Sequence, residues 1–346
     1  MENKRFNIGD IAKLAGVSLS TVSGVINNRP NVKPATRDRI LQVIKECNYV
    51  PQSSARALAG KRSKRLCFLV SSNVTLGMAN VYFSTILSGV NSVCQAGGYQ
   101  VVVGTYDLSN ISRFILPPDL ASNSSDGLIL AGLTDIAVIR EIQKTGIPFI
   151  IINGDYPDPD ILTLNSHESI SLTNMLLHLL KLGHRRIIIP HTAAYSFQAY
   201  QRVLAALQRL DNYLDTELIP WQHELDEFAA GRLLANEWLL QRQQFTGLIA
   251  NDQFAIAFLH EFLQLGGRCP ADVSIVATEN YFLQYCQVPL TALDERVFEV
   301  GCHAATHLLD LLEGKRSFEE VRHEIATKPI ITKLIVREST APRFKE

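Results

Sequence analysis

Residues Ile8–Asn27 read IGDIAKLAGVSLSTVSGVIN, and residues Tyr49–Lys61 read YVPQSSARALAGK. In the first stretch, apolar residues recur at helical spacing on both sides of Gly16, which allows a tight turn between two short helices. Ser18 stands where its side-chain oxygen can cap the second helix. A third helix is expected over Pro34–Cys47, because proline suits a first helical turn. Three short helices joined in this way predict a helix-turn-helix, whose second helix enters the DNA major groove.

The apolar positions of these helices predict a small core, and the polar positions predict an outer face. Small polar side chains at Ser20, Thr21 and Ser23 fall on the outer face, where they can approach phosphates and base edges. A helical bundle that serves only for packing would show the same residue sizes, so this pattern alone leaves both interpretations open. The residues expected to face inward are Ile8, Ile11, Ala12, Ala15, Val22, Val25, Ile26, Ile40, Leu41, Val43 and Ile44.

Charge is distributed unevenly along the 346 residues. The net charge is −1, but residues 1–65 hold 13 Lys and Arg against 4 Asp and Glu, whereas the remainder holds 20 against 30. A basic head on an acidic body favours a polyanionic partner for the head and disfavours the bundle that serves only for packing. With 47% hydrophobic residues, the chain can also build a large core in more than one domain.

Neither membrane insertion nor export is expected. No apolar run is long enough to span a bilayer, and the N-terminal residues MENKRFNIGD lack a hydrophobic signal core. The six scattered cysteines form no C-x-x-C pair, which is typical of reduced thiols in a cytosolic protein. We therefore expect a cytoplasmic location.

From Leu66 onward, buried-strand patterns alternate with helical patterns. This alternation predicts parallel sheets covered on both faces, arranged as two doubly wound subdomains with a cleft between them. Pro117 and Pro118 interrupt the helical period, so only a short helix before Pro117 is expected there. The expected strands are 66–70, 99–104, 127–132, 149–153, 185–190, 247–251 and 273–277, and the expected helices are 82–96, 136–144, 169–181, 197–210, 228–241 and 253–265.

The stretch IAKLAGVSLSTVSGVINNRPNVKPATRDRILQVIKECNYVPQSSARALAGK resembles the head and hinge of the LacI/GalR family of transcription regulators. Pieces such as GIPFIIIN, LLKLGHRRIIIP and PADVSIVA continue the resemblance less closely through the body. The resemblance implies an α/β fold class, with an N-terminal all-α helix-turn-helix head and a periplasmic-binding-protein-like body of two doubly wound parallel-sheet subdomains. It places the head at residues 1–50, the hinge helix and linker at 51–65, and the effector-binding and dimerisation domain at 66–346, with crossovers near 165, 293 and 326.

Carried over residue by residue, the resemblance also implies the DNA contacts. Leu58 would wedge into a central minor-groove step and bend the DNA, although it could instead pack at the junction of head and body. Gly24 stands where the family often has a larger polar or basic side chain, so direct base readout is lost there. The implied DNA-binding residues are Leu19, Ser20, Thr21, Ser23, Gly24, Asn27 and Thr36 in the head, and Ala55, Arg56 and Leu58 in the hinge.

The same resemblance implies an effector cleft with one prominent departure. Phe197 stands where the family usually has a ligand-clamping arginine, and a phenyl ring cannot supply charged bidentate donors. Phe197 could stack on a sugar face or a ring, or merely pack a helix N-terminus, or the clamping role could fall to Arg202. The implied effector-binding residues are Tyr82, Asn153, Phe197, Asn251, Asp252 and Glu279, the last standing where an Asp is usual.

Enzymatic chemistry has little support in the sequence. No phosphate-loop, dinucleotide, esterase or zincin pattern occurs, so no catalytic residue, cofactor or metal is expected. His303 and His307 are spaced i, i+4, but ordinary helix positions are the better interpretation. Asp155, Asp158 and Asp160 lie in DYPDPD, where a solvated surface turn is expected.

The prediction is a homodimeric transcription regulator that binds double-stranded operator DNA and a small-molecule effector. We expect a repressor of carbohydrate-utilisation genes, with a sugar or a sugar-phosphate-like molecule as its effector. Two other hypotheses stay open at this point. One is a regulator whose cleft has lost sugar binding and responds to a protein partner or another metabolite. The other is a cytosolic α/β enzyme with an accessory DNA-binding head.

Overall fold

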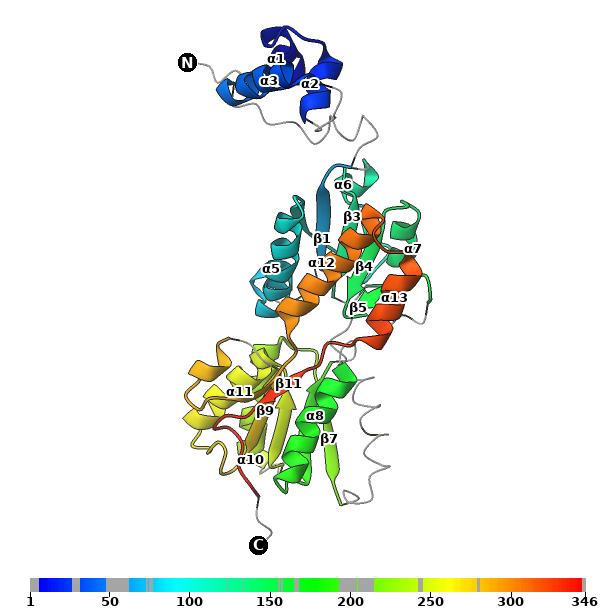
Figure 1. The fold of residues 1–346 in the computed structure, drawn as a ribbon. Helices are drawn as coiled ribbons and strands as arrows, with labels where there is room; N and C mark the ends of the chain where they lie inside the picture. The colour runs from blue at the N-terminus through cyan, green and yellow to red at the C-terminus, as the bar shows by residue number, and fades with distance from the viewer. Residues whose placement is uncertain are drawn as a thin grey trace. The chain divides into compact units, whose positions relative to one another are not determined.

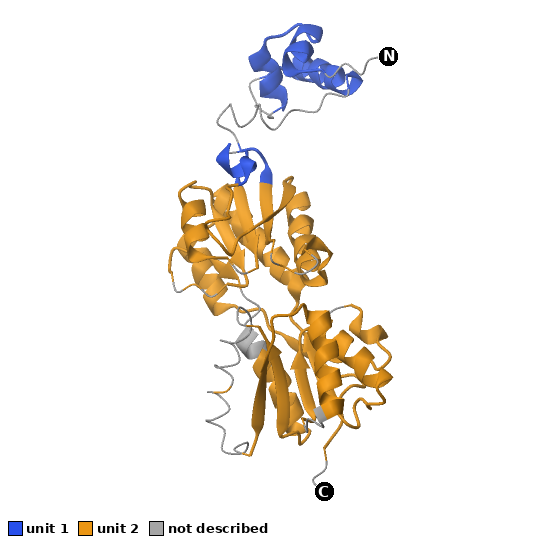
Figure 2. Ribbon diagram, turned by 180° about the vertical axis from the view of Figure 1, so that it is seen from behind, with its two compact units in different colours: residues 1–65, 117–126 blue, residues 66–116, 127–346 orange. Residues whose placement is uncertain are grey.

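Contacts divide the chain into two compact units, which Figure 2 shows in different colours. Unit 1 comprises residues 1–65 and 117–126, and unit 2 comprises residues 66–116 and 127–346. The computed structural model describes residues 6–26, 32–47, 62–72, 74, 77–122, 124–132, 134–154, 156, 158–164, 168–192, 204, 215–241, 245–278 and 281–343.

Three short helices form the N-terminal part of unit 1: α1 (Ile8–Leu14), α2 (Leu19–Ile26) and α3 (Pro34–Glu46) (Figure 1). The turn between α1 and α2 contains Gly16 at φ +63°, a conformation that glycine adopts without steric cost. The Ser18 hydroxyl then accepts a hydrogen bond from the Thr21 amide at 3.2 Å, which caps α2. The predicted helix-turn-helix arrangement of elements is therefore confirmed.

The helices enclose a small apolar core, as the residue pattern predicts. Burial of each of its larger aliphatic side chains stabilises the fold by roughly 1.5–3 kcal/mol. The expectation that Leu41 faces inward is wrong, because its side chain is 48% exposed on the outer face of α3. The fully buried members are Ile11, Ala12, Ala15, Val22, Val25 and Ile40, and Ile8, Ile26, Val43 and Ile44 pack against them while partly exposed.

The expected short helix before Pro117 is wrong, because the helix in this region, α6 (Pro118–Ala121), follows Pro117. Proline fits the first turn of a helix, where the N–H that it lacks would have no helical partner. The residues just before Pro117 form no helix, and a turn over 111–113 takes its place.

The carboxylate of Asp126 organises the linker residues that lead into the body. It accepts hydrogen bonds from the Ser63 amide at 2.6 Å, from the Ser63 hydroxyl at 2.8 Å and from the Lys64 amide at 2.8 Å. Lys64 has φ +56°, which few non-glycine residues adopt, and the bond to Asp126 helps to hold that conformation. Hydrogen bonds to a charged acceptor are strong, so this residue fixes the backbone direction at which β1 begins.

Unit 2 contains two sheets, each with helices on both faces (Figure 1). Sheet A has the order β2-β1-β3-β4-β5, and β1, β3, β4 and β5 pair in parallel. Helices α5, α7, α12 and α13 accompany it. The strands are β1 (Arg65–Ser71), β2 (Gln100–Tyr106), β3 (Gly127–Ala131), β4 (Phe149–Ile152) and β5 (Thr163–Leu164), and the helices are α5 (Val81–Ala96), α7 (Ile136–Gln143), α12 (Val297–Glu313) and α13 (Phe318–Thr327).

Sheet B has the order β11-β10-β9-β8-β6-β7, with parallel pairing except between β10 and β11. Helix α8 lies on one face, and α10 and α11 pack together on the other (Figure 1). The strands are β6 (Arg186–His191), β7 (Glu217–Gln222), β8 (Gly247–Ala250), β9 (Ser274–Thr278), β10 (Thr291–Asp294) and β11 (Lys333–Ile335), and the helices are α8 (Glu168–Lys181), α10 (Glu227–Gln241) and α11 (Asp252–Gln264). The predicted doubly wound parallel-sheet architecture is confirmed.

Most of the expected strands and helices are present, but β5, β7 and β10 and the helices α12 and α13 are absent from the sequence-based expectation. Pro220 disfavours a central strand, yet β7 is an edge strand, where a missing N–H breaks no ladder bond. The helix expected over 197–210 falls outside the described residues, apart from Leu204. None of the described helices is long and apolar enough to cross a membrane.

The C-terminal part of the chain returns to sheet A through a close crossing of α5 and α12. A Cβ atom added at Gly89 would lie 2.1 Å from the Phe298 carbonyl oxygen, and one added at Gly301 would lie 2.1 Å from the Ile86 carbonyl oxygen. Only glycine at both positions allows this backbone approach. Buried residues of α12 thereby join the core of sheet A, although they follow sheet B in the chain.

The buried His184 predicts acid sensitivity of the body. It lies between the Thr246 hydroxyl at 2.9 Å and the Ala341 carbonyl oxygen at 3.1 Å, and burial lowers its pKa to about 4. Because the unfolded chain binds this proton more readily, stability is lost as the pH falls from about 6.5 towards 4, by about 3 kcal/mol at most.

Chemical denaturation at pH 7 and pH 5 measures this effect. His184→Gln should reduce the difference in the free energy of unfolding between pH 7 and pH 5. The substitution His303→Gln, at an exposed position, should leave this difference as in the parent protein. An unchanged difference in His184→Gln would show that another group carries the acid sensitivity.

Candidate nucleic-acid interface and effector site

The first turn of α2 presents the residues expected to read base edges. Leu19 is 54% exposed and Ser20 is exposed, whereas Thr21 and Ser23 are half-buried. The Ser18 hydroxyl lies 2.8 Å from the Ser20 hydroxyl and 2.7 Å from the Thr21 hydroxyl, so these three oxygens form one local network. A helix N-terminus with exposed hydroxyls and a positive dipole end is suited to a phosphate-bearing partner.

Gly24 and Thr36 occupy less exposed positions than these residues. Gly24 is buried, and a Cβ added there would lie 3.4 Å from Val32 Cγ2, an ordinary contact distance. Thr36 is half-buried in the first turn of α3, and exposed Lys33 precedes that turn without a side-chain capping bond. The expected contacts Asn27, Ala55, Arg56 and Leu58 lie outside the described residues.

In the first subdomain, the structure brings two of the expected effector residues together. Asn153, directly after β4, donates a hydrogen bond from Nδ2 to the hydroxyl of Tyr82 in the first turn of α5. Asn153 adopts φ +60°, which asparagine tolerates better than most residues. Tyr82 also packs edge-on against Phe83, with 5.2 Å between the ring centroids. The pair places an amide and a phenol at the carboxyl edge of sheet A.

In the second subdomain, Asn251 and Asp252 lie at the carboxyl end of β8. The Asn251 side chain accepts a hydrogen bond from the Phe254 amide at 2.9 Å, which caps α11. The Asp252 amide donates to the Thr278 hydroxyl at 3.2 Å, which joins the ends of β8 and β9. Glu279, which follows Thr278, is outside the described part of the chain, as are Phe197 and Arg202.

Two buried histidines at the same edge are absent from the sequence-based site. His191 ends β6 and His223 follows β7, and the His223 amide donates to the His191 carbonyl oxygen at 3.0 Å. His223 Nδ1 donates to the Leu225 carbonyl oxygen at 3.2 Å, and its ring centroid lies 5.3 Å from that of Trp221. A polar residue directly after a strand signals such a position, but it is visible only when β7 is recognised as a strand.

Glu227 is the carboxylate that faces His223. Its Oε2 lies 3.8 Å from His223 Nε2. Burial raises the pKa of Glu227, although a hydrogen bond with the Asn251 side chain and the charge of His223 lower it. The edge therefore combines a carboxylate, an imidazole and an amide, which can exchange hydrogen bonds with a polar ligand.

Metal chemistry gains no support from the geometry. Within the residues that the structure describes, no group of three or more His, Cys, Asp or Glu side chains could hold a metal ion. His303 and His307 share a helix face with ring centroids 5.9 Å apart, and burial lowers the pKa of His307. Asp158 is ion-paired with Arg140. Both observations agree with the ordinary helix and surface-turn positions expected for them.

Comparison with known proteins accounts for both parts of the chain. The model "Bacterial regulatory proteins, lacI family" matches residues 7–52, and the model "Periplasmic binding protein-like domain" matches residues 176–340. The chain belongs to the LacI family of bacterial regulatory proteins. One relative of this LacI-family chain is the probable HTH-type transcriptional repressor ExuR of Bacillus subtilis, 28% identical over 88% of this chain and 91% of ExuR.

Solved structures of LacI-family regulators share the fold. The Lac repressor dimer bound to operator and the anti-inducer ONPF has a TM-score of 0.81 at 24% identity, covering 98% of this chain and 100% of that chain. The CelR–cellobiose complex has a TM-score of 0.67 at 24% identity, covering 97% of this chain and 100% of that chain. ExuR is named as a transcriptional repressor and CelR as a transcriptional regulator, and neither name is that of an enzyme.

Gly24 provides a test of the head that separates stability from DNA contact. Gly24→Ala should raise the free energy of unfolding of the head by about 1 kcal/mol, because glycine is unfavourable inside a helix and the added methyl has room. Gly16→Ala is the matched control and should destabilise the head, since Gly16 has a positive φ.

Hydrogen exchange of the α2 amides measures the stability of both variants. Operator affinity should stay within about twofold in Gly24→Ala, because Gly24 is buried and the added methyl would contact Val32. A tenfold loss of affinity in a variant that is more stable would place the Gly24 backbone against DNA.

Proposed function

We propose that this LacI-family protein is a cytoplasmic, homodimeric repressor that binds a pseudo-palindromic operator. A small carbohydrate-like effector controls that binding. The exposed first turn of α2, on a three-helix head whose segment carries nine surplus positive charges, is the observation that carries the proposal. Phosphate attraction supplies general DNA affinity, and the side chains of Leu19 and Ser20 supply contact with base edges.

The proposed effector site combines the carboxyl edges of sheets A and B. Tyr82 and Asn153 would contact the ligand from one subdomain, and Asn251 and Asp252 from the other, together with Phe197 and Glu279. Amide and hydroxyl groups suit a ligand rich in hydroxyls, because each can donate or accept a hydrogen bond. The complexes of Lac repressor with ONPF and of CelR with cellobiose support a carbohydrate-like ligand in this fold.

The proposed control follows from linkage between the two parts. A ligand that contacts both edges binds more tightly to the conformation with one angle between the subdomains than to a conformation with another angle. The ligand therefore shifts the population towards the conformation that it prefers. The linker residues Ser63 and Lys64 are tied to Asp126, so a movement of the body is transmitted to the start of the hinge. Two heads on one dimer read two half-sites, which multiplies affinity and specificity.

Selection of genomic fragments by the full-length protein tests the proposal. We expect a pseudo-palindromic sequence bound at least 1000-fold more tightly than random duplex, a ratio typical of specific DNA binding. One member of a panel of sugars and sugar phosphates should change that affinity by tenfold or more. Equal binding to all fragments, with and without the panel, would contradict the proposal.

Leu58 tests the proposed hinge contact. Leu58→Ala should weaken operator binding by tenfold or more and nonspecific binding by less than twofold, because a wedge between base steps acts only on the bent, specific site. Leu41→Ala, which changes a half-exposed leucine on α3, is the matched control and should leave both affinities unchanged. Equal losses in specific and nonspecific binding would remove the wedge from the mechanism.

A further inference from the structure

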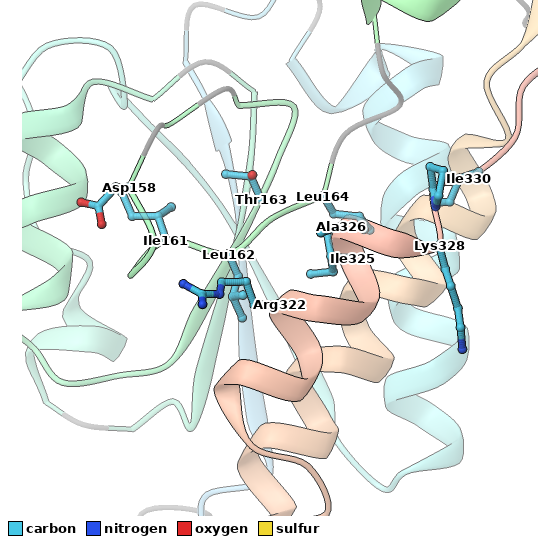
Figure 3. A pocket seen from close by; sticks show the side chains of 11 residues that line it. Asp158, Ile161, Leu162, Thr163, Leu164, Arg322, Ile325, Ala326, Lys328 and Ile330 are labelled. Atoms are coloured by element: carbon cyan, nitrogen blue, oxygen red, sulfur yellow. The ribbon is translucent and has the colours of Figure 1, made fainter.

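A pocket of about 300 Å³ lies between α13 and the segment that leads into β5 (Figure 3). Ile161, Leu162 and Leu164 line one side, and Ile325 and Ile330 line the other. Figure 3 shows the Arg322 side chain extending from α13, with its guanidinium on the side of the pocket where Asp158 and Ile161 lie. The volume is at the small end of the range for ligand pockets, and the walls are mainly aliphatic, so the space suits a compact apolar molecule.

Arg322 is the polar group best placed to orient such a molecule. Its Nη1 donates to the Pro159 carbonyl oxygen at 3.3 Å, and its Nη2 contacts Glu319 at 2.5 Å. A guanidinium carries five N–H donors, so these two contacts leave it able to bind an anion as well. The Arg322 side chain is 43% exposed and Glu319 is 69% exposed, so their ion pair is weak enough for a ligand carboxylate to compete.

The other charged residues that line the pocket are ion-paired. Lys328 lines the pocket and pairs with Glu324 at 3.1 Å, in an exposed i, i+4 ion pair. Asp158, the one acidic lining residue, is ion-paired with Arg140. These pairs leave little net charge at the pocket, so the preference for a carboxylate over an amine rests on the N–H donors of Arg322.

The pocket touches two of the segments that connect the sheets. Leu164 is the last residue of β5 in sheet A, and the chain continues from there to α8 on sheet B. Lys328, Pro329 and Ile330 lead from α13 on sheet A to β11 in sheet B. A ligand lodged between Leu164 and Ile330 would contact both connections, and these are the segments that move when the subdomains change their angle.

We propose that this pocket binds a compact apolar carboxylate through Arg322. We further propose that this second ligand modulates operator affinity through the two connecting segments; this second part rests on the proposed function. The pocket reaches the carboxyl edge of sheet A at Leu164, whose carbonyl oxygen accepts a hydrogen bond from the Asn153 amide at 3.2 Å. Occupation of the pocket and of the effector site can therefore be coupled through this contact.

Calorimetric titration of the full-length protein tests binding without any DNA. 4-Methylpentanoate should bind saturably, and 4-methylpentan-1-ol and 4-methylpentylamine should bind at least tenfold more weakly. Arg322→Gln should weaken carboxylate binding by tenfold or more, whereas Arg113→Gln, an exposed arginine outside the pocket, should leave it unchanged. Ala326→Trp, which fills the pocket from an exposed position on α13, should abolish binding without unfolding the protein.

Failure to bind, or equal binding of acid, alcohol and amine, would overturn the carboxylate site. Binding that survives both Arg322→Gln and Ala326→Trp would place the carboxylate elsewhere and overturn it as well. The second part is tested by operator affinity with and without saturating 4-methylpentanoate, for which we expect a change of threefold or more that Ala326→Trp removes. An unaltered operator affinity would overturn the regulatory part. If no operator is found, the proposed function is refuted. The calorimetric titration would still show whether the pocket binds the carboxylate.

Discussion

The backbone contact between α5 and α12 is the constraint on which the two-subdomain body depends. Gly89 and Gly301 each approach a carbonyl of the other helix so closely that no side chain fits between them. This contact draws α12 back to sheet A after the chain has already completed most of sheet B. The chain must therefore pass from sheet A to sheet B and back again. These connections hold together the two carboxyl edges that carry the proposed effector residues.

Much of this architecture could be predicted from the sequence, because buried parallel strands such as GLILA and FIII are continuous apolar runs. The fold of the head could also be predicted from the sequence, since Gly16 marks the turn between α1 and α2 and Ser18 marks the cap of α2. The missed strand β7 has an alternating burial pattern and an internal proline, and β5 has only two residues. Such short or edge strands gain their order from neighbouring strands, and local sequence carries little sign of them.

The candidate site could be predicted only in part. Asn153 and Tyr82 are 71 positions apart in the sequence, and only the resemblance to a family, not local pattern, suggested that they share a site. Local sequence does not place His223 and Glu227 in the site, because their positions relative to the sheet depend on where β7 ends. Leu41 is a residue for which the sequence pattern predicts burial that the structure does not show. Its apolar side chain fits the helical period of α3, but the small head has too little interior to bury every apolar residue of its third helix.

The two borders of sheet B have a consequence for the behaviour of the protein at high concentration. A β-sheet with an open border can recruit strands from other molecules, and such recruitment leads to aggregation. Pro220 removes a hydrogen-bond donor from the β7 border, and β11 offers only three residues, beginning with the exposed Lys333. Growth of this sheet by strands of further chains is thereby discouraged at both of its borders.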